Sequence, residues 1–196
     1  PLRDARHRIL TQVGDTLVEH YDGEVSGMVD AANSSCVANG TGLVERIVAE
    51  FPSFEDTASL SLPDQRSVNV RFWKRAQLAA AMMYGRFHDS DVSPVTDIES
   101  LTVFADYHLP NILREFGVLT YSESLAEQID AGVLLAAGSR EETELRAATI
   151  YASDVLIEAI NSRRDSPIYA PRLDYKLFSL RDDVPTPVHL TRTTAY

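Results

Sequence analysis

An acidic residue in an apolar stretch is the feature of this sequence best suited to chemistry. Asp106 lies within the apolar run 101–110, and the only residue within five positions that could be basic is His108. A carboxylate is costly to remove from water without a partner, so Asp106 either faces solvent or is partnered by a group distant in sequence. It could be the reactive carboxylate of a pocket. It could also be the N-cap of a helix beginning at His108, since Asp is favoured at N-caps and Pro110 suits a first turn. The two roles are compatible.

Two basic residues at the start of a predicted helix are the second candidate. Residues 73–87 are rich in Ala, Leu and Met, which favour helix, and Lys74 and Arg75 fall in the first turn. Cations at this end oppose the helix dipole. Either the charge is used at a site, or the long side chains simply extend to solvent.

The elements that must position these residues are mostly helices. Apolar periodicity predicts helices at 2–21, 43–51, 110–116, 121–129 and 139–160, the first with a stripe that includes Leu10 and Val18. In the last helix Ser139 and Glu142 form a capping box. Residues 67–72 alternate as in a short strand, and 188–196 are expected to form an extended tail that packs down. We therefore expect a mainly α-helical fold, one domain over residues 1–196, with one or two short strands or extended segments.

Other single features have ordinary explanations. The Phe-Pro-Ser-Phe run at 51–54 is expected to plug the core at a helix end, although it could be a stacking platform. Arg146 lies near the apolar positions of the last long helix and is expected to pair with an acid.

The composition excludes several classes of protein. A net charge of −11 without a basic run argues against binding duplex nucleic acid. The single cysteine, Cys36, cannot form an internal disulfide, which indicates a reducing compartment such as the cytoplasm. No apolar run approaches the roughly 20 residues of a membrane span, and the histidine spacings predict no metal site. Because the first residue is Pro, the chain is expected to be processed, cut or part of a longer protein.

Several segments together resemble the queuosine salvage proteins, which release queuine from queuosine 5′-monophosphate. These segments are residues 6–10, 51–54, 72–77, 104–107 followed by Pro110, 138–146, 173–175, and the tail with His189, Arg192 and Tyr196. The resemblance covers nearly the whole chain, in order. It implies a mainly helical fold similar to the helical DNA glycosylases. Because family members usually carry a further N-terminal region, it also implies that this chain is the C-terminal part of a longer protein.

The resemblance implies hydrolysis of an N-glycosidic bond, with Asp106 and Lys74 as the catalytic residues. Such cleavage passes through an oxocarbenium-like sugar. Asp106 would stabilise that charge, attack it or position water. A lysine within roughly 4 Å would keep Asp106 ionised, or would instead touch the phosphate or the sugar.

The resemblance also supplies candidate substrate contacts. Either His189 or Arg192 would hold the 5′-phosphate, and either Glu142 or Asp174 would meet the cationic amine of the base. The remaining candidates are aromatic: Trp73, Phe104, Tyr107 and Tyr196. No metal or organic cofactor is required, and the expected partner is the small-molecule nucleotide, bound by a monomer.

Two other classes of function stay open. One is a helical module that binds a nucleoside or tRNA fragment without cleaving it. The other is an acidic helical adaptor between proteins.

Overall fold

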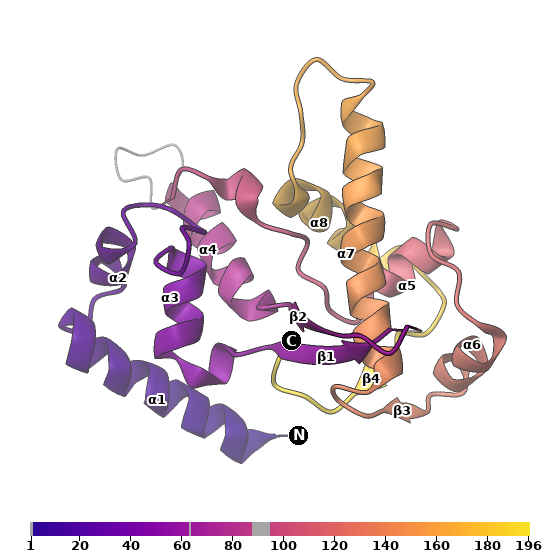
Figure 1. Ribbon diagram of the computed structural model, residues 1–196, viewed down its shortest axis with the longest axis horizontal. Helices are drawn as coiled ribbons and strands as arrows, with labels where there is room; N and C mark the ends of the chain where they lie inside the picture. The colour runs from indigo at the N-terminus through magenta and orange to yellow at the C-terminus, as the bar shows by residue number, and fades with distance from the viewer. Residues whose placement is uncertain (1, 63, 88–94) are drawn as a thin grey trace. The chain divides into compact units, whose positions relative to one another are not determined.

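The computed structural model describes residues 2–62, 64–87 and 95–196. The chain divides into two compact units. The first comprises Pro1–Asp56, Trp73–Leu101 and Ala195, and the second Thr57–Phe72, Thr102–Thr194 and Tyr196. Helices dominate both units, which confirms the predicted fold class (Figure 1). That the whole chain forms one domain stays a prediction.

The first unit is helical. It contains α1 (Arg3–Tyr21), α2 (Val25–Ala31), α3 (Leu43–Glu50), the 3₁₀ turns η1 (Pro52–Phe54) and η2 (Ile98–Ser100), and α4 (Lys74–Phe87). Helix α2 packs against both α1 and α3, and α3 packs against α4. The buried side chains of this unit include Leu43, Val44, Ile47, Phe51, Ala76 and Ala80. The predicted helices α1, α3 and α4 are confirmed, whereas α2 was not predicted.

Helix α1 buries less of its apolar stripe than its periodicity predicts. Ile9, Val13 and Leu17, spaced four residues apart, are half-buried. Leu10 and Val18 are exposed, because each lies about 100° around the helix from that row. No residue of α1 is fully buried, so this helix contributes less to the core than its apolar stripe predicts.

The second unit is arranged around its longest helix. It contains β1 (Thr57–Ser61), β2 (Ser67–Arg71), α5 (His108–Glu115), α6 (Glu123–Asp130), β3 (Leu134–Leu135), α7 (Arg140–Asn161), α8 (Ala170–Phe178), η3 (Arg181–Asp183) and β4 (Leu190–Thr191). Helices α5 and α8 and strand β1 pack against α7, and α5 also packs against α8 (Figure 1). The helices predicted at α5, α6 and α7 are confirmed.

Two small sheets complete the second unit. Strand β2 is the predicted strand and pairs antiparallel with β1, placing Thr57 opposite Arg71. Strands β3 and β4 form a two-residue parallel pair, with Leu134 opposite Leu190. The pairing confirms that the tail is extended and packs down. Strand β1 and helix α8 were not predicted.

The apolar core of the second unit lies between its helices. Ile112 and Leu113 of α5 meet Leu173 and Leu177 of α8, and Ile157 of α7 packs against them. An adjoining cluster joins Val103, Leu109 and Ala170. Residues 103–106 are therefore buried beside α5, α7 and α8, which places Asp106 near polar side chains of these helices.

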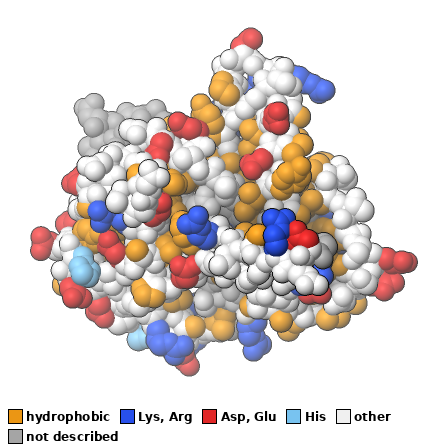
Figure 2. Space-filling view, viewed as in Figure 1, with side chains coloured by type: hydrophobic (Ala, Val, Ile, Leu, Met, Phe, Trp, Pro, Cys, Tyr) orange, Lys and Arg blue, Asp and Glu red, His pale blue; other side chains and the backbone are white. Residues whose placement is uncertain are grey.

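The surface charge follows the composition. On the face drawn in Figure 2, the basic side chains of the described residues stand apart from one another among acidic ones. None of the helices in the described ranges combines the length and the apolar character needed to cross a bilayer.

Candidate functional site

Asp106 caps the helix that follows it. Its Oδ1 accepts hydrogen bonds from the backbone N–H groups of His108 (2.8 Å) and Leu109 (3.3 Å), the first two residues of α5. The side chain is buried, with Asp106 only 6% exposed. The capping role is thus confirmed, and the cap fixes the orientation of the carboxylate. The reactive role stays a prediction.

Two further helices hold the backbone in front of Asp106. The Phe104 N–H donates to Oδ2 of Asp174, on α8, at 2.7 Å. The Ala105 carbonyl accepts from Nε of Arg146, on α7, at 3.1 Å. Both partners are buried. The peptide groups leading into Asp106 are therefore located by side chains that lie 41 and 70 residues away in sequence.

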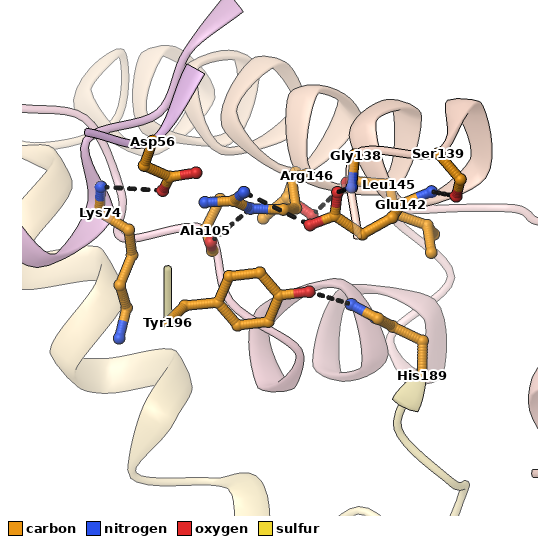
Figure 3. Close-up of polar contacts among 11 residues, drawn as sticks. Asp56, Lys74, Ala105, Gly138, Ser139, Glu142, Leu145, Arg146, His189 and Tyr196 are labelled. Atoms are coloured by element: carbon orange, nitrogen blue, oxygen red, sulfur yellow. Dashed lines mark hydrogen bonds and ion pairs between the residues drawn. The ribbon is translucent and has the colours of Figure 1, made fainter. Parts of the chain in front are cut away.

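The Arg146 guanidinium is the centre of a buried cluster (Figure 3). Its Nη1 lies 3.3 Å from Oε1 of Glu142, and each of the two side chains is 3% exposed. Its Cζ lies over the ring of Phe72, 3.9 Å from the centroid, and over the ring of Tyr196 at 4.5 Å. The predicted pairing of Arg146 with an acid is confirmed, and the acid is Glu142.

This pairing alters the predicted capping box of α7. The Ser139 hydroxyl accepts from the Glu142 N–H at 3.3 Å, as predicted. The Glu142 carboxylate does not return to the Ser139 N–H, however, because Oε2 accepts from the Gly138 N–H at 3.1 Å while Oε1 meets Arg146. One carboxylate thus ties the helix start to the buried guanidinium.

The tail brings a histidine and a tyrosine to the same cluster. His189 Nε2 lies 3.3 Å from the Tyr196 hydroxyl, while its buried Nδ1 has no hydrogen-bond partner among the described residues. Burial, and then the Arg146 charge, lower the pKa of His189 to about 4, against a smaller opposing effect of Asp106. The imidazole is therefore neutral near pH 7. Burial likewise raises the pKa of the Tyr196 hydroxyl.

The other predicted residues of this unit differ in their surroundings. Tyr107 is partly exposed, and its ring lies 6.2 Å from that of Tyr196. Phe104 is buried, and its backbone N–H donates to Asp174. Arg192 is exposed. The structure therefore gathers Asp106, Glu142, His189 and Tyr196 around Arg146, with Tyr107 at the side of Tyr196.

In the first unit, Trp73, the residue before Lys74, has an unusual backbone conformation. Trp73 has φ +46°, a left-handed conformation that is costly for a bulky side chain. Asp56 supports it, because its carbonyl accepts from the Trp73 N–H at 3.3 Å and its Oδ2 accepts from the Lys74 N–H at 3.4 Å. The Trp73 indole N–H donates to Glu55 at 3.4 Å. This strain sits immediately before Lys74, and strained residues cluster at functional sites. Lys74 and Asp106 belong to different units, so their proximity stays a prediction.

Arg75, the second cation of that turn, has partners within the first unit. It donates to the Ser53 carbonyl and lies over the Phe54 ring at 4.6 Å. Burial lowers its pKa. Phe51 is buried edge-on to Phe54, as expected for a core plug. Arg75 thus connects the first turn of α4 to the 3₁₀ turn η1.

Two residues of the cluster were missed as site residues. Arg146 was expected to be structural only, and Phe72 was seen only as the end of a strand. A local signal existed for the first: Glu142 and Arg146 are spaced i, i+4, the spacing at which an acid and a base can pair on one helix face. No local signal indicated Phe72 as its partner.

The similarity to known proteins extends over the whole chain. The family model described as "Queuosine salvage protein" matches residues 1–196. A protein of Sphaerobacter thermophilus named "Queuosine 5'-phosphate N-glycosylase/hydrolase" is 38% identical over 199 residues, covering 100% of this chain and 58% of the relative. Relatives of the same name from Mus musculus and Dictyostelium discoideum are 33% and 30% identical, and the chain covers 59% of each. The chain thus spans less than two thirds of the length of the curated relatives it matches.

Proposed function

The chain belongs to the queuosine salvage protein family, and we propose that the protein containing it hydrolyses queuosine 5′-monophosphate. In the proposed reaction the bond between C1′ of the ribose and the base nitrogen breaks. Water supplies a hydroxyl group to C1′ and a proton to the departing base, so the products are queuine and ribose 5-phosphate.

The observation that supports this most directly is the buried, oriented carboxylate of Asp106. The transition state of glycoside cleavage carries positive charge on the sugar, and a carboxylate aimed at C1′ stabilises it or directs a water molecule to it. Asp106 is held at its own carboxylate by α5 and at the preceding carbonyl by Arg146. Such double support is what a group that must keep its position during a reaction requires.

The other site residues are assigned by chemistry. Lys74 supplies the second charge of the site and interacts either with Asp106 or with the substrate. It follows Trp73, whose backbone is strained. Arg192 is exposed and suits a charged contact with the 5′-phosphate. His189 is neutral, so it contributes a hydrogen bond from Nδ1 rather than a charge. We assign the faces of the base to Trp73, Tyr107 and Tyr196.

Three predicted residues take supporting roles in this proposal. Glu142 and Asp174 were candidates for the amine of the base, but each already accepts hydrogen bonds from the protein. Phe104 is buried beside Asp174. We therefore assign these residues to the framework around Asp106. We further propose a monomer that acts in the cytoplasm without a metal or organic cofactor.

The test is product analysis with the protein at its full natural length. The protein is incubated with queuosine 5′-monophosphate, with the queuosine nucleoside and with guanosine 5′-monophosphate, and free base is detected by mass. The Sphaerobacter thermophilus relative is the positive control. Queuine released from the monophosphate, with no base from guanosine 5′-monophosphate, is the expected result. If the relative releases queuine and this protein does not, the proposal is wrong, and tight binding of the intact nucleotide would then indicate a binding module.

A further inference from the structure

One buried side chain contacts four segments of the second unit. The Arg146 guanidinium reaches the Ala105 carbonyl, the Glu142 carboxylate, and the rings of Phe72 and Tyr196. These come from the loop before α5, the first turn of α7, the residue that follows β2, and the tail. Figure 3 shows the guanidinium between the Ala105 carbonyl and the Glu142 carboxylate, with the Tyr196 ring beside it.

Stability alone is a weak reason for this arrangement. Removing two charges from water costs about as much as their attraction returns, so an apolar pair of similar size would hold the same helices together as well. Arginine differs from an apolar residue, and from lysine, in its planar fork of donors and its stacking faces. The contacts use both properties, because the edge donates to Ala105 and Glu142 while the plane meets two rings.

Two of these contacts, to Ala105 and to Tyr196, fix groups beside the candidate chemistry. The Ala105 carbonyl belongs to the peptide bond that leads into Asp106, so its hydrogen bond limits how that carboxylate can turn. The Tyr196 ring carries the hydroxyl that meets His189 Nε2. His189 is only 3% exposed, and its Nδ1 has no hydrogen-bond partner among the described residues. A buried nitrogen of this kind indicates a missing hydrogen-bond partner, such as a bound ligand.

We propose that Arg146 is a positioning residue: it aligns Asp106 with the tail that carries His189 and Tyr196, so that both face the same ligand. The activity part of this inference rests on the proposed function. Arg146 acts through its neighbours and does not itself touch the substrate.

The test uses paired substitutions, so that no buried charge is left alone. Arg146→Gln with Glu142→Gln removes the central pair. The matched control is Arg114→Gln with Asp130→Asn, because Arg114 also pairs with an acid (2.8 Å) and lies over a tyrosine ring at 4.8 Å. Arg146→Lys keeps the charge and loses the fork. Each variant is assayed for queuine release well below its melting temperature, and for backbone amide hydrogen exchange.

The expected results separate positioning from general stability. In the Arg146 double variant kcat falls about 100-fold while KM stays within about threefold, and Arg146→Lys lies between it and wild type. Amides of residues 103–109 and 189–196 exchange at least about tenfold faster in the double variant, and at the wild-type rate in the Arg114 control. The control keeps kcat within about twofold.

Two results would overturn the inference. One is a double variant whose kcat stays within about threefold of wild type, or whose exchange in the two segments is unchanged. The other is an equal loss of kcat in the Arg114 control, which would indicate a general effect of stability. If the wild-type protein releases no base, the proposed function fails, and the exchange data still decide whether Arg146 aligns the two segments.

Discussion

Asp106 has two roles that two substitutions can separate. Asp106→Asn keeps an oxygen that can accept from the N–H groups of α5 but removes the negative charge. Asp106→Ala removes both. If Asp106 is a cap and also the reactive carboxylate, the first variant loses activity and keeps stability, and the second loses both.

The structure sets the size of each effect. Oδ1 of Asp106 accepts one short hydrogen bond of 2.8 Å and one longer bond of 3.3 Å at a buried position. Replacing an N-cap by Ala costs about 0.5–2 kcal/mol, and burial places this site near the upper end, at about 2 kcal/mol. Asn caps about as well as Asp, so Asp106→Asn should cost about 0.5 kcal/mol or less. Losing the charge should lower kcat about 1,000-fold, or about 4 kcal/mol of barrier.

The assay combines unfolding and turnover. Urea unfolding gives the free energy of unfolding of each variant, and the melting temperature of the Ala variant should fall by about 4–8 °C. Queuine release gives kcat. Asp64→Asn is the control, because Asp64 is an exposed acid paired with Arg66, and it should alter neither quantity measurably.

Two outcomes would refute this reasoning. If Asp106→Asn keeps kcat within about tenfold of wild type, the charge of Asp106 is not used in the reaction. If Asp106→Asn destabilises the protein as much as Asp106→Ala, the oxygen shared by Asp and Asn is not the capping group.

Three further predictions concern stability. Asp174→Ala leaves the buried Phe104 N–H without its acceptor and should lower the free energy of unfolding by about 1–3 kcal/mol in urea titrations, with a smaller loss for Asp174→Asn. The pKa of His189 is about 4 in the folded protein, below the value of 6.5 for an unperturbed histidine, so the unfolded chain binds a proton first as pH falls. The free energy of unfolding should therefore decrease as pH falls from about 6.5 to about 4, and His189→Gln should flatten that slope. A Cβ at Gly42 would lie 2.5 Å from the Cys36 carbonyl oxygen, so Gly42→Ala should lower the melting temperature markedly, and an unchanged melting temperature would contradict this geometry.

Helices that are determined by neighbouring residues could be predicted from the sequence, whereas elements that depend on tertiary contacts could not. Helix α4 is a run of strong helix formers, and α7 begins at a serine cap, so both could be located from neighbouring residues alone. Helix α8 has only nine residues, and its buried side includes Leu173 and Leu177 against α5. The sequence carries only a few local signals for this helix, namely Pro171 in its first turn and the i, i+4 spacing of Leu173 and Leu177, and it is the packing against α5 that stabilises it. Strand β1 likewise exists because β2 pairs with it.

The same distinction applies to the site. The capping role of Asp106 could be predicted from its neighbours in sequence, because a carboxylate at a helix start lies close to the N–H groups two and three residues later. Nothing in that stretch indicates that Arg146 and Asp174 hold its backbone, or that Phe72 and Tyr196 meet over one guanidinium. Those contacts join residues that are 41 to 74 positions apart, and side chains so far apart in sequence come together only when the helices pack. The helix cap could therefore be predicted from the sequence, whereas the partners of each buried charge were decided by the packing of the folded core.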